Sequence, residues 1–205
     1  MLFLIVPMLE VHAFTAAAVQ PYLDEVAALR IAVFRDWPYL YDGDAAYEHS
    51  YLATYAQAAS SLFVLAFDGA RVVGASTAVA LVEETEAIRA PFERMGWNVA
   101  EVFYFGESVL LPEYRGRGLG HRFFDEREAH ARRLGGYATT AFCSVVRSQD
   151  DPRRPVEYRG NDAFWRKRGY APVDGLRCVL DWPEVGMEGS IAHALQFWSR
   201  SLEAA

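Results

Sequence analysis

The sequence predicts a single domain of the mixed α/β class, built on a twisted sheet of six to seven strands. The chain has 205 residues, which suits one domain. Two β-rich runs meet at Asp68-Gly69-Ala70, which indicates an antiparallel hairpin. A strand-like run, a helical run and a second strand-like run then follow one another over residues 100–146. This order predicts two parallel strands joined by a right-handed helical crossover.

The composition is that of a globular protein with a sizeable core. Hydrophobic residues make up 52% of the chain and charged residues 23%, which excludes a disordered chain. The net charge of −7 argues against nucleic-acid binding, because such proteins carry a basic surface for phosphate. Seven arginines nevertheless fall between Arg115 and Arg147. This local basic region predicts one compact anionic ligand.

Cysteine, histidine and the apolar start of the chain bear on location and metals. The two cysteines, Cys143 and Cys178, have no metal-binding spacing and favour a reducing, cytoplasmic compartment. None of the five histidines has metal spacing, so we expect no metal. The opening MLFLIVPML is too short to span a bilayer and lacks the basic start of a signal peptide. We therefore expect no membrane association.

The first part of the chain predicts a strand, two helices and an aromatic loop. Residues 8–15 alternate loosely between apolar and polar, as in a strand, and apolar residues at helical spacing predict a helix after Pro21 that extends to residue 35. The segment DWPYLYDGD, residues 36–44, has loop chemistry with many aromatic side chains. Residues 45–59 return to a helical pattern.

The middle of the chain predicts the hairpin and the central strand. Residues 61–67 and 71–81 are the two β-rich runs, and residues 83–95 form a short helix or a loop. Residues 100–111 predict a long strand that Gly106 interrupts, where we expect a β-bulge.

The last part predicts two more helices and two or three strands. A helix over 119–134 places Leu119, Phe123, Ala131 and Leu134 on its apolar face, and Arg122, Asp125, Glu126, Glu128, Arg132 and Arg133 toward solvent. Residues 137–146 and 176–182 are strands, and a short helix capped by Gly160 or Asn161 ends at Gly169. Residues 191–202 fit a helix or a strand equally well.

The turn between the central strand and the long helix carries the strongest functional signal. Three glycines, Gly116, Gly118 and Gly120, alternate there with Arg115, Arg117 and Leu119. Glycines let a backbone approach a phosphate closely, and the start of a helix presents free N–H groups and a positive dipole end. The turn is not a P-loop, and His121 replaces the third glycine of a dinucleotide fingerprint. We therefore expect a pyrophosphate site of another kind.

These residues resemble the central signature of the GNAT N-acetyltransferases, V-x-P-x-x-R-x-x-G-x-G/A. The matching stretch is LLPEYRGRGLG, residues 110–120, with leucine in place of the usual valine. A second stretch, NDAFWRKRGY over 161–170, is similar to a later element of that family. The resemblance covers about residues 60–182, and we treat residues 1–205 as one such domain.

The resemblance implies helices on both faces of the sheet, a splayed parallel pair at its centre and acetyl-CoA as co-substrate. Main-chain groups of Val109, Leu110 and Leu111 would be left unpaired for the pantetheine arm. The pyrophosphate would lie on the amides from Arg115 to Gly120. Asn161 and Trp165 would approach the pantetheine.

The implied reaction is direct attack of an amine on the thioester, which requires removal of a proton. Glu107, beside the expected bulge, is the candidate base, although a surface or salt-bridged carboxylate is an equal interpretation. Glu101, Glu83 and Glu84 are weaker candidates. Trp165 stands where many relatives carry the acid tyrosine, and indole cannot release its proton. Either one of Tyr104, Tyr158 and Tyr170 serves as the acid, or the thiolate leaves unaided.

The acceptor is expected to be the amine of a small molecule or an amino acid. Three aromatic residues of the 36–44 loop, together with Glu83, Glu84 and Glu107, suit a cationic amine or an amino acid, whereas Arg147 and residues 148–155 would suit a carboxylate. These alternatives stay open, as does a homodimer. Cys143 is interpreted as a core residue and not as a nucleophile. The rival function is a noncatalytic acyl-CoA-binding or sensing module.

Overall fold

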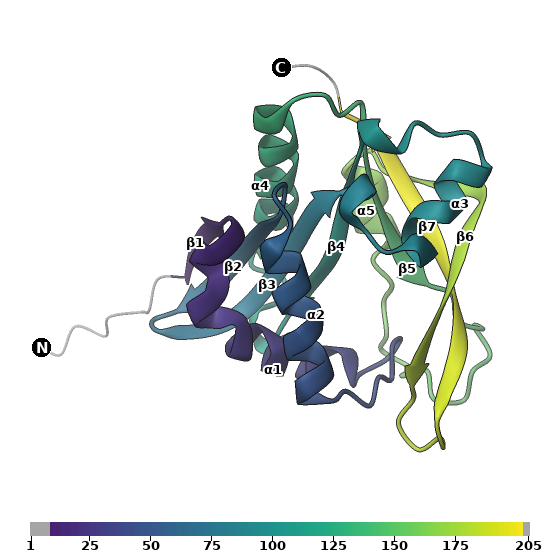
Figure 1. Ribbon diagram of the computed structural model, residues 1–205. Coiled ribbons are helices and arrows are strands. Elements are labelled where there is room, and N and C mark those ends of the chain that lie inside the picture. Colours follow the sequence, from purple (N-terminus) through teal and green to yellow (C-terminus); the bar gives the residue numbers. More distant parts are fainter. Residues whose placement is uncertain (1–8, 203–205) are drawn as a thin grey trace, which may run out of the picture.

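The structure, a computed structural model, describes residues 9–202; residues 1–8, which include most of the apolar opening stretch, and 203–205 lie outside the described residues. One mixed seven-stranded sheet has the order β1-β2-β3-β4-β5-β7-β6 (Figure 1). The strands are β1 (Leu9–Phe14), β2 (Leu62–Asp68), β3 (Arg71–Ala80), β4 (Val102–Leu110), β5 (Thr139–Val145), β6 (Ala171–Pro183) and β7 (Ser190–Ser201). The α-helices are α1 (Leu23–Phe34), α2 (Ala45–Gln57), α3 (Glu86–Arg94), α4 (Leu119–Leu134) and α5 (Asp162–Lys167).

This arrangement confirms the predicted fold class. The hairpin β2–β3 turns at Gly69, whose φ of 60° is a left-handed conformation that glycine adopts readily. Strands β4 and β5 are parallel, with α4 as the crossover between them. The ambiguous last segment is a strand, because β7 pairs with both β5 and β6 and so completes the sheet.

Helices cover both faces of the sheet, as predicted. In Figure 1, α1 and α2 lie in front of β2–β4 and α3 lies in front of β5–β7, whereas α4 stands behind. The alternation of side chains along β2 explains this: Phe63 and Leu65 pack toward α1 and α2, and Leu62 and Val64 pack toward α4. Both faces of β2 are therefore apolar and buried.

Two predictions for α4 are wrong. Leu134 is 47% exposed, because the helix ends there and Gly135 turns the chain away. Glu128 is only 4% exposed, because Arg168 and Arg200 reach over it from α5 and β7 and form ion pairs with its carboxylate. The helical pattern of α4 predicted that Glu128 faces solvent. It is buried because α5 and β7 pack over it, which the pattern of one helix does not contain.

The central strands separate partway along their length. Strands β4 and β5 pair only at Val102–Thr139, Phe103–Thr140 and Tyr104–Ala141. Beyond Tyr104, β4 continues alongside β3 and β5 continues alongside β7. The edges of β4 and β5 that face each other are consequently left without a strand partner, which is the splayed pair that the sequence predicted.

A β-bulge lies in β4 at the point where the splay begins, as expected. The register with β3 passes from Ala78–Phe105 to Ser76–Ser108, so β4 carries one extra residue at Gly106 and Glu107. A Cβ atom at Gly106 would lie 2.5 Å from the Thr77 hydroxyl oxygen and 2.8 Å from that of Tyr55. Glycine is therefore required for β3 and α2 to approach β4 this closely.

Candidate active site

The glycine-arginine turn opens helix α4 beside the splayed strands. After the 3-10 turn Pro112–Tyr114, Gly116 and Gly118 adopt φ values of 76° and 82°, and Gly118 is the N-cap of the helix. The first main-chain hydrogen bonds of α4 run from His121 and Arg122 to the Gly118 carbonyl. The amides of Leu119 and Gly120 precede these bonds, so they belong to the free N–H groups at the positive end of the helix dipole. Such a helix start can hold a pyrophosphate.

Both arginines of this turn are exposed and positioned by main-chain carbonyls. Arg115 donates from Nε to the Leu110 carbonyl at 3.2 Å, and Arg117 donates from Nη2 to the Glu113 carbonyl at 2.9 Å. Each guanidinium has five N–H donors, so several remain for an anion. The sequence pattern and the local geometry agree on an anion site here.

The cofactor role predicted for the main chain of residues 109–111 needs correction. Val109 lies opposite Ala75 and directs its main-chain groups to β3, whereas Leu110 directs its groups to the splay, where its carbonyl accepts from Nε of Arg115. Leu111, in contrast, donates its N–H to the Val73 carbonyl, and its own carbonyl accepts from the Tyr114 N–H, both at 3.0 Å. The expectation of unpaired main-chain groups is therefore wrong for Val109, which pairs with β3, and for Leu111, because the chain already turns into the Pro112–Tyr114 segment.

Helix α5 packs against the start of α4. A Cβ at Gly120 would lie 3.4 Å from the Phe164 ring, so this glycine also lets the two helices approach. Asn161 is exposed at the N-cap of α5 and makes no side-chain capping hydrogen bond. Trp165 packs between the Phe142 and Trp198 rings, with centroid distances of 5.0 and 5.1 Å. Trp165 is thus half-buried and packs with the core. The side-chain amide of Asn161, in contrast, remains available for a hydrogen bond to a ligand.

Glu107 is buried in the bulge, with one carboxylate oxygen paired and the other not. Its Oε2 lies 2.6 Å from Nη1 of Arg30, and its Oε1 is buried with no hydrogen-bond partner among the described residues. Arg30, on α1, also pairs through Nε with Glu48 of α2. Glu107 is therefore a salt-bridged carboxylate, as one interpretation of the sequence predicted. It also keeps one unpaired oxygen, which a general base requires.

The main chain of Glu107 is held from both sides of the sheet. Its N–H donates to the Thr77 hydroxyl at 3.2 Å, and its carbonyl accepts from Nη1 of Arg127 at 3.3 Å. Arg127, on α4, also donates to the Thr77 and Phe123 carbonyls. Burial lowers the pKa of Arg127 to about 10, so its guanidinium stays charged at neutral pH. Arg127 therefore positions the bulge that carries Glu107.

A second buried carboxylate, Glu84, lies near Glu107. It accepts a hydrogen bond from the Tyr55 hydroxyl and another from the Thr85 N–H. Burial raises the pKa of Glu84, and the charge of Glu107 adds to this effect. The other two carboxylates considered as bases have other partners: Glu83 accepts from Ser60 and the Ala59 N–H, and Glu101 is exposed beside Asn98.

The raised pKa of Glu84 predicts a pH-dependent stability. Folded Glu84 keeps its proton above the ordinary pKa of 4.5, whereas the unfolded chain loses it there. The unfolding free energy contributed by this group is therefore present below pH 4.5 and is lost as pH rises through the folded pKa. We expect Glu84→Gln to gain stability relative to wild type between pH 4 and 7, measured by urea unfolding. The exposed Glu93→Gln is the control, and equal pH trends in both variants would contradict the prediction.

The three candidate acid tyrosines lie in different places. Tyr104 is buried on the same face as α3, and its hydroxyl lies 3.1 Å from Sγ of Cys143. Burial, followed by the Cys143 thiol, raises the pKa of Tyr104 well above its usual value. Tyr170 lies on the other face, where its hydroxyl contacts Thr140 at 2.8 Å and Glu128 at 3.2 Å. The structure therefore does not bring Tyr170 together with Glu107, since the sheet stands between them.

The third tyrosine, Tyr158, is half-buried against the aromatic loop. Its ring packs against that of Trp37 in a T-shaped arrangement, with 6.2 Å between the ring centroids. The loop itself is fastened by Arg147, whose Nε and Nη2 donate to the Pro38 and Tyr39 carbonyls at 2.6 and 2.8 Å. The 36–44 loop is thus tied to the segment that follows β5, next to the open end of the splay.

Sequence reasoning missed Arg30, Glu48 and Arg127 as site residues. Arg30 lies in the apolar second half of α1, Glu48 lies among polar residues of α2, and Arg127 lies in the charged run of α4. A signal exists for both arginines: Arg30 falls on the buried helical stripe with Val26 and Ala27, and Arg127 falls on that of α4, four residues from Phe123 and from Ala131. A charged residue in an apolar stripe indicates a buried partner.

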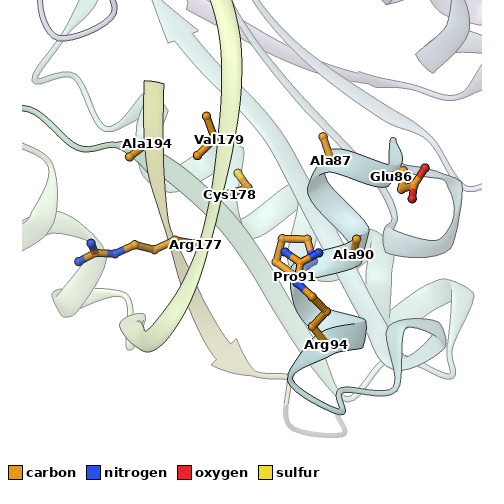
Figure 2. Close-up of a pocket in the computed structure, with 9 residues that line it drawn as sticks. All are labelled: Glu86, Ala87, Ala90, Pro91, Arg94, Arg177, Cys178, Val179 and Ala194. Atoms are coloured by element: carbon orange, nitrogen blue, oxygen red, sulfur yellow. The ribbon is translucent and has the colours of Figure 1, made fainter. Parts of the chain in front are cut away.

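A surface hollow of about 560 Å³ lies away from these residues, between α3 and the strands β6 and β7. Figure 2 shows Pro91 and two alanines of α3 facing Cys178 and Val179 across it. Over residues 9–202, no group of three or more His, Cys, Asp or Glu side chains is arranged to hold a metal ion. None of the helices in this range is both long and apolar enough to cross a bilayer.

Comparisons with known proteins agree with this geometry. The family model described as the acetyltransferase (GNAT) family matches residues 26–156, which include most of α1, the bulge and the glycine-arginine turn. Comparison with curated proteins gives no match.

Solved structures share the fold at low sequence identity. An N-acetyltransferase from Staphylococcus aureus Mu50 is 12% identical, with a TM-score of 0.60 and coverage of 95% of this chain and 99% of that one. A ribosomal-protein-alanine N-acetyltransferase from Brucella melitensis is 14% identical, with a TM-score of 0.61 and coverage of 94% and 99%. An acetyltransferase from Thermus thermophilus is 18% identical, with a TM-score of 0.53 and coverage of 96% and 98%.

Proposed function

The chain belongs to the acetyltransferase (GNAT) family, and from this membership we propose that it transfers an acetyl group from acetyl-CoA to the primary amine of a small molecule. The observation that carries the proposal is the free Oε1 atom of Glu107 at the start of the splay between β4 and β5. The second supporting feature is the start of α4 at Gly118, where free N–H groups suit a pyrophosphate. A base and an anion site are the two parts that this reaction requires of the protein.

Acetyl-CoA supplies the activated acyl group as a thioester, and the remaining chemistry falls to residues of this chain. The amides of Arg115 to Gly120, with the Arg115 and Arg117 side chains, hold the pyrophosphate. The N–H of Leu110 at the splayed edge of β4 and the exposed Asn161 hold the pantetheine arm. These residue types fit the group because they offer N–H donors and strand-edge carbonyls.

Glu107 accepts the proton of the attacking amine on Oε1. The amine nitrogen bonds to the acyl carbon, the carbon–sulfur bond breaks, and the electron pair goes to sulfur. Tyr104 is the candidate acid, because Tyr170 lies on the opposite face of the sheet from Glu107. Two free thiols, Cys143 and Cys178, support a reducing compartment such as the cytoplasm.

The alternative is a noncatalytic acyl-CoA-binding module, which Trp165 favours because it replaces a tyrosine acid. Turnover separates the two functions. Thiol release from acetyl-CoA in the presence of a mixed panel of primary amines, above the rate without amine, supports the enzyme. Binding of CoA without any amine-dependent thiol release would support the module instead.

Cofactor binding at the glycine-arginine turn is tested by charge at Gly118. A Cβ at this position meets no atom within 4 Å, and both Asn and Asp tolerate its left-handed backbone. We expect Gly118→Asp to weaken CoA binding roughly tenfold or more relative to Gly118→Asn, because its carboxylate repels the pyrophosphate. Calorimetry at two salt concentrations measures both, and wild-type affinity should fall with salt. Equal affinities for the two variants would place the pyrophosphate elsewhere.

A further inference from the structure

We infer that the acceptor is a cationic amine with an apolar body and no carboxylate group. This inference rests on the proposed acetyl transfer and narrows its substrate class. Four features carry it: the buried carboxylates around Glu107, the aromatic rings that surround them, the engagement of the nearby arginines, and the unpaired oxygen that awaits an N–H donor.

The site contains more buried carboxylate than buried cation on the face of the sheet that α1 and α2 cover. Glu48, Glu84 and Glu107 are 0%, 7% and 8% exposed, and Arg30 pairs with one oxygen of Glu48 and one of Glu107. Arg127 reaches Glu107 only from the α4 side, through its main-chain carbonyl. Oε1 of Glu107 therefore stays buried without a donor among residues 9–202. Such an orphaned acceptor is expected to be satisfied by a ligand, and a protonated amine supplies the donor.

Aromatic rings border this group of carboxylates. The Arg30 guanidinium lies 4.6 Å from the centroid of Tyr51 and 5.1 Å from that of Phe34. Phe34 in turn packs on Tyr39 at 4.5 Å. The guanidinium of Arg30 thus already lies between aromatic rings and carboxylates. The half-buried faces of Tyr39 and Tyr51 suit the apolar body of a second cation, because ring faces attract positive charge.

The arginines that would receive a carboxylate are engaged elsewhere. Nη2 of Arg147 lies 2.6 Å from Glu184, and the same side chain donates to two loop carbonyls. Arg153 lies 3.1 Å from Glu184 and 2.7 Å from Asp151. Burial opposes ionisation of Glu184, yet hydrogen bonds from Arg153 and Arg147 lower its pKa, so these pairs are charged at neutral pH.

Arg154 differs from these two, because it is exposed on the ring of Tyr158, at 6.0 Å from the centroid. It therefore faces solvent, where its attraction for a carboxylate is screened. A carboxylate on the acceptor would meet Glu84 and Glu107 without a buried partner, and like-charge contact of this kind rejects a ligand. We therefore expect the acceptor to be a cationic amine and not an amino acid.

Matched acceptor pairs test this inference with the wild-type protein and acetyl-CoA: tyramine with tyrosine, tryptamine with tryptophan, and phenethylamine with phenylalanine. We expect kcat/KM for thiol release to be about tenfold or more higher for at least one amine than for its amino acid. An amino acid that equals or exceeds its amine in every active pair would overturn the inference and leave the proposed acetyl transfer intact. Absence of thiol release with every acceptor would contradict the proposed transfer itself.

Amide controls separate charge from bulk. Tyrosinamide, tryptophanamide and phenylalaninamide keep the added group but carry no carboxylate charge. Because the inference is electrostatic, we expect the amides to recover most of the loss between amine and amino acid. Amides as poor as the amino acids would show that bulk at the α-carbon causes the discrimination, and this result would overturn the inference.

Discussion

Replacing Glu107 by glutamine lowers kcat/KM for an amine acceptor by about 10²-fold or more, the usual contribution of a positioned general base. The amide keeps the size of the side chain and an acceptor atom for Arg30, so Kd for CoA stays within a few-fold. The loss shrinks as pH rises, because a larger fraction of the amine is then already neutral. Steady-state kinetics from pH 6 to 9 and calorimetry with CoA measure these effects.

A matched control for this variant is Glu25→Gln, which changes an exposed carboxylate on α1 and should keep wild-type kinetics. If Glu107→Gln also retains wild-type kcat/KM at neutral pH, Glu107 is only the partner of Arg30. The proton would then leave through water or through Glu84, the other buried carboxylate near the bulge.

Replacing Arg30 by methionine lowers the free energy of unfolding by about 3–5 kcal/mol, because two buried carboxylates lose their cation. Glu48 and Glu107 come from α2 and β4, so the variant removes a tie between these elements and α1. Methionine keeps the length of the apolar stem, which limits the packing contribution. Denaturant unfolding at pH 7 measures the change.

The comparison variant for stability is Arg35→Met, at the end of the same helix. Its ion pair with Asp42 is equally short, at 2.6 Å, but both side chains are more than half exposed. We expect a loss of at most about 1 kcal/mol there, the usual range for a surface pair. The double variant Arg30→Met/Glu107→Gln should recover part of the Arg30→Met loss, since one unpaired charge is removed. Similar losses at Arg30 and Arg35, or no recovery, would mean that the buried pairs contribute little.

Local patterns in the sequence were enough for most elements and for the glycine turn at the start of α4. The Asp68-Gly69 turn predicted the β2–β3 hairpin, and the glycines at 116, 118 and 120 predicted a tight turn into α4, where Gly116 and Gly118 adopt a left-handed backbone. Gly106 predicted the bulge beside Glu107. For the two turns the deciding interaction lies within a few residues, so the local sequence is sufficient to predict them. For residues 191–202 the local sequence is not sufficient, because pairing with β5 and β6 decides between strand and helix.

The sequence by itself determined the mixed α/β class, the order of most elements and the glycine turn that opens α4. Only the tertiary structure decided that Arg30 of α1 pairs with Glu107 of β4, that Arg127 of α4 holds the Glu107 carbonyl, and that Tyr170 lies on the opposite face of the sheet. The physical reason is that burial and charge pairing depend on which elements pack together. A helix or strand period fixes the face on which a side chain lies, but not the partner that waits there.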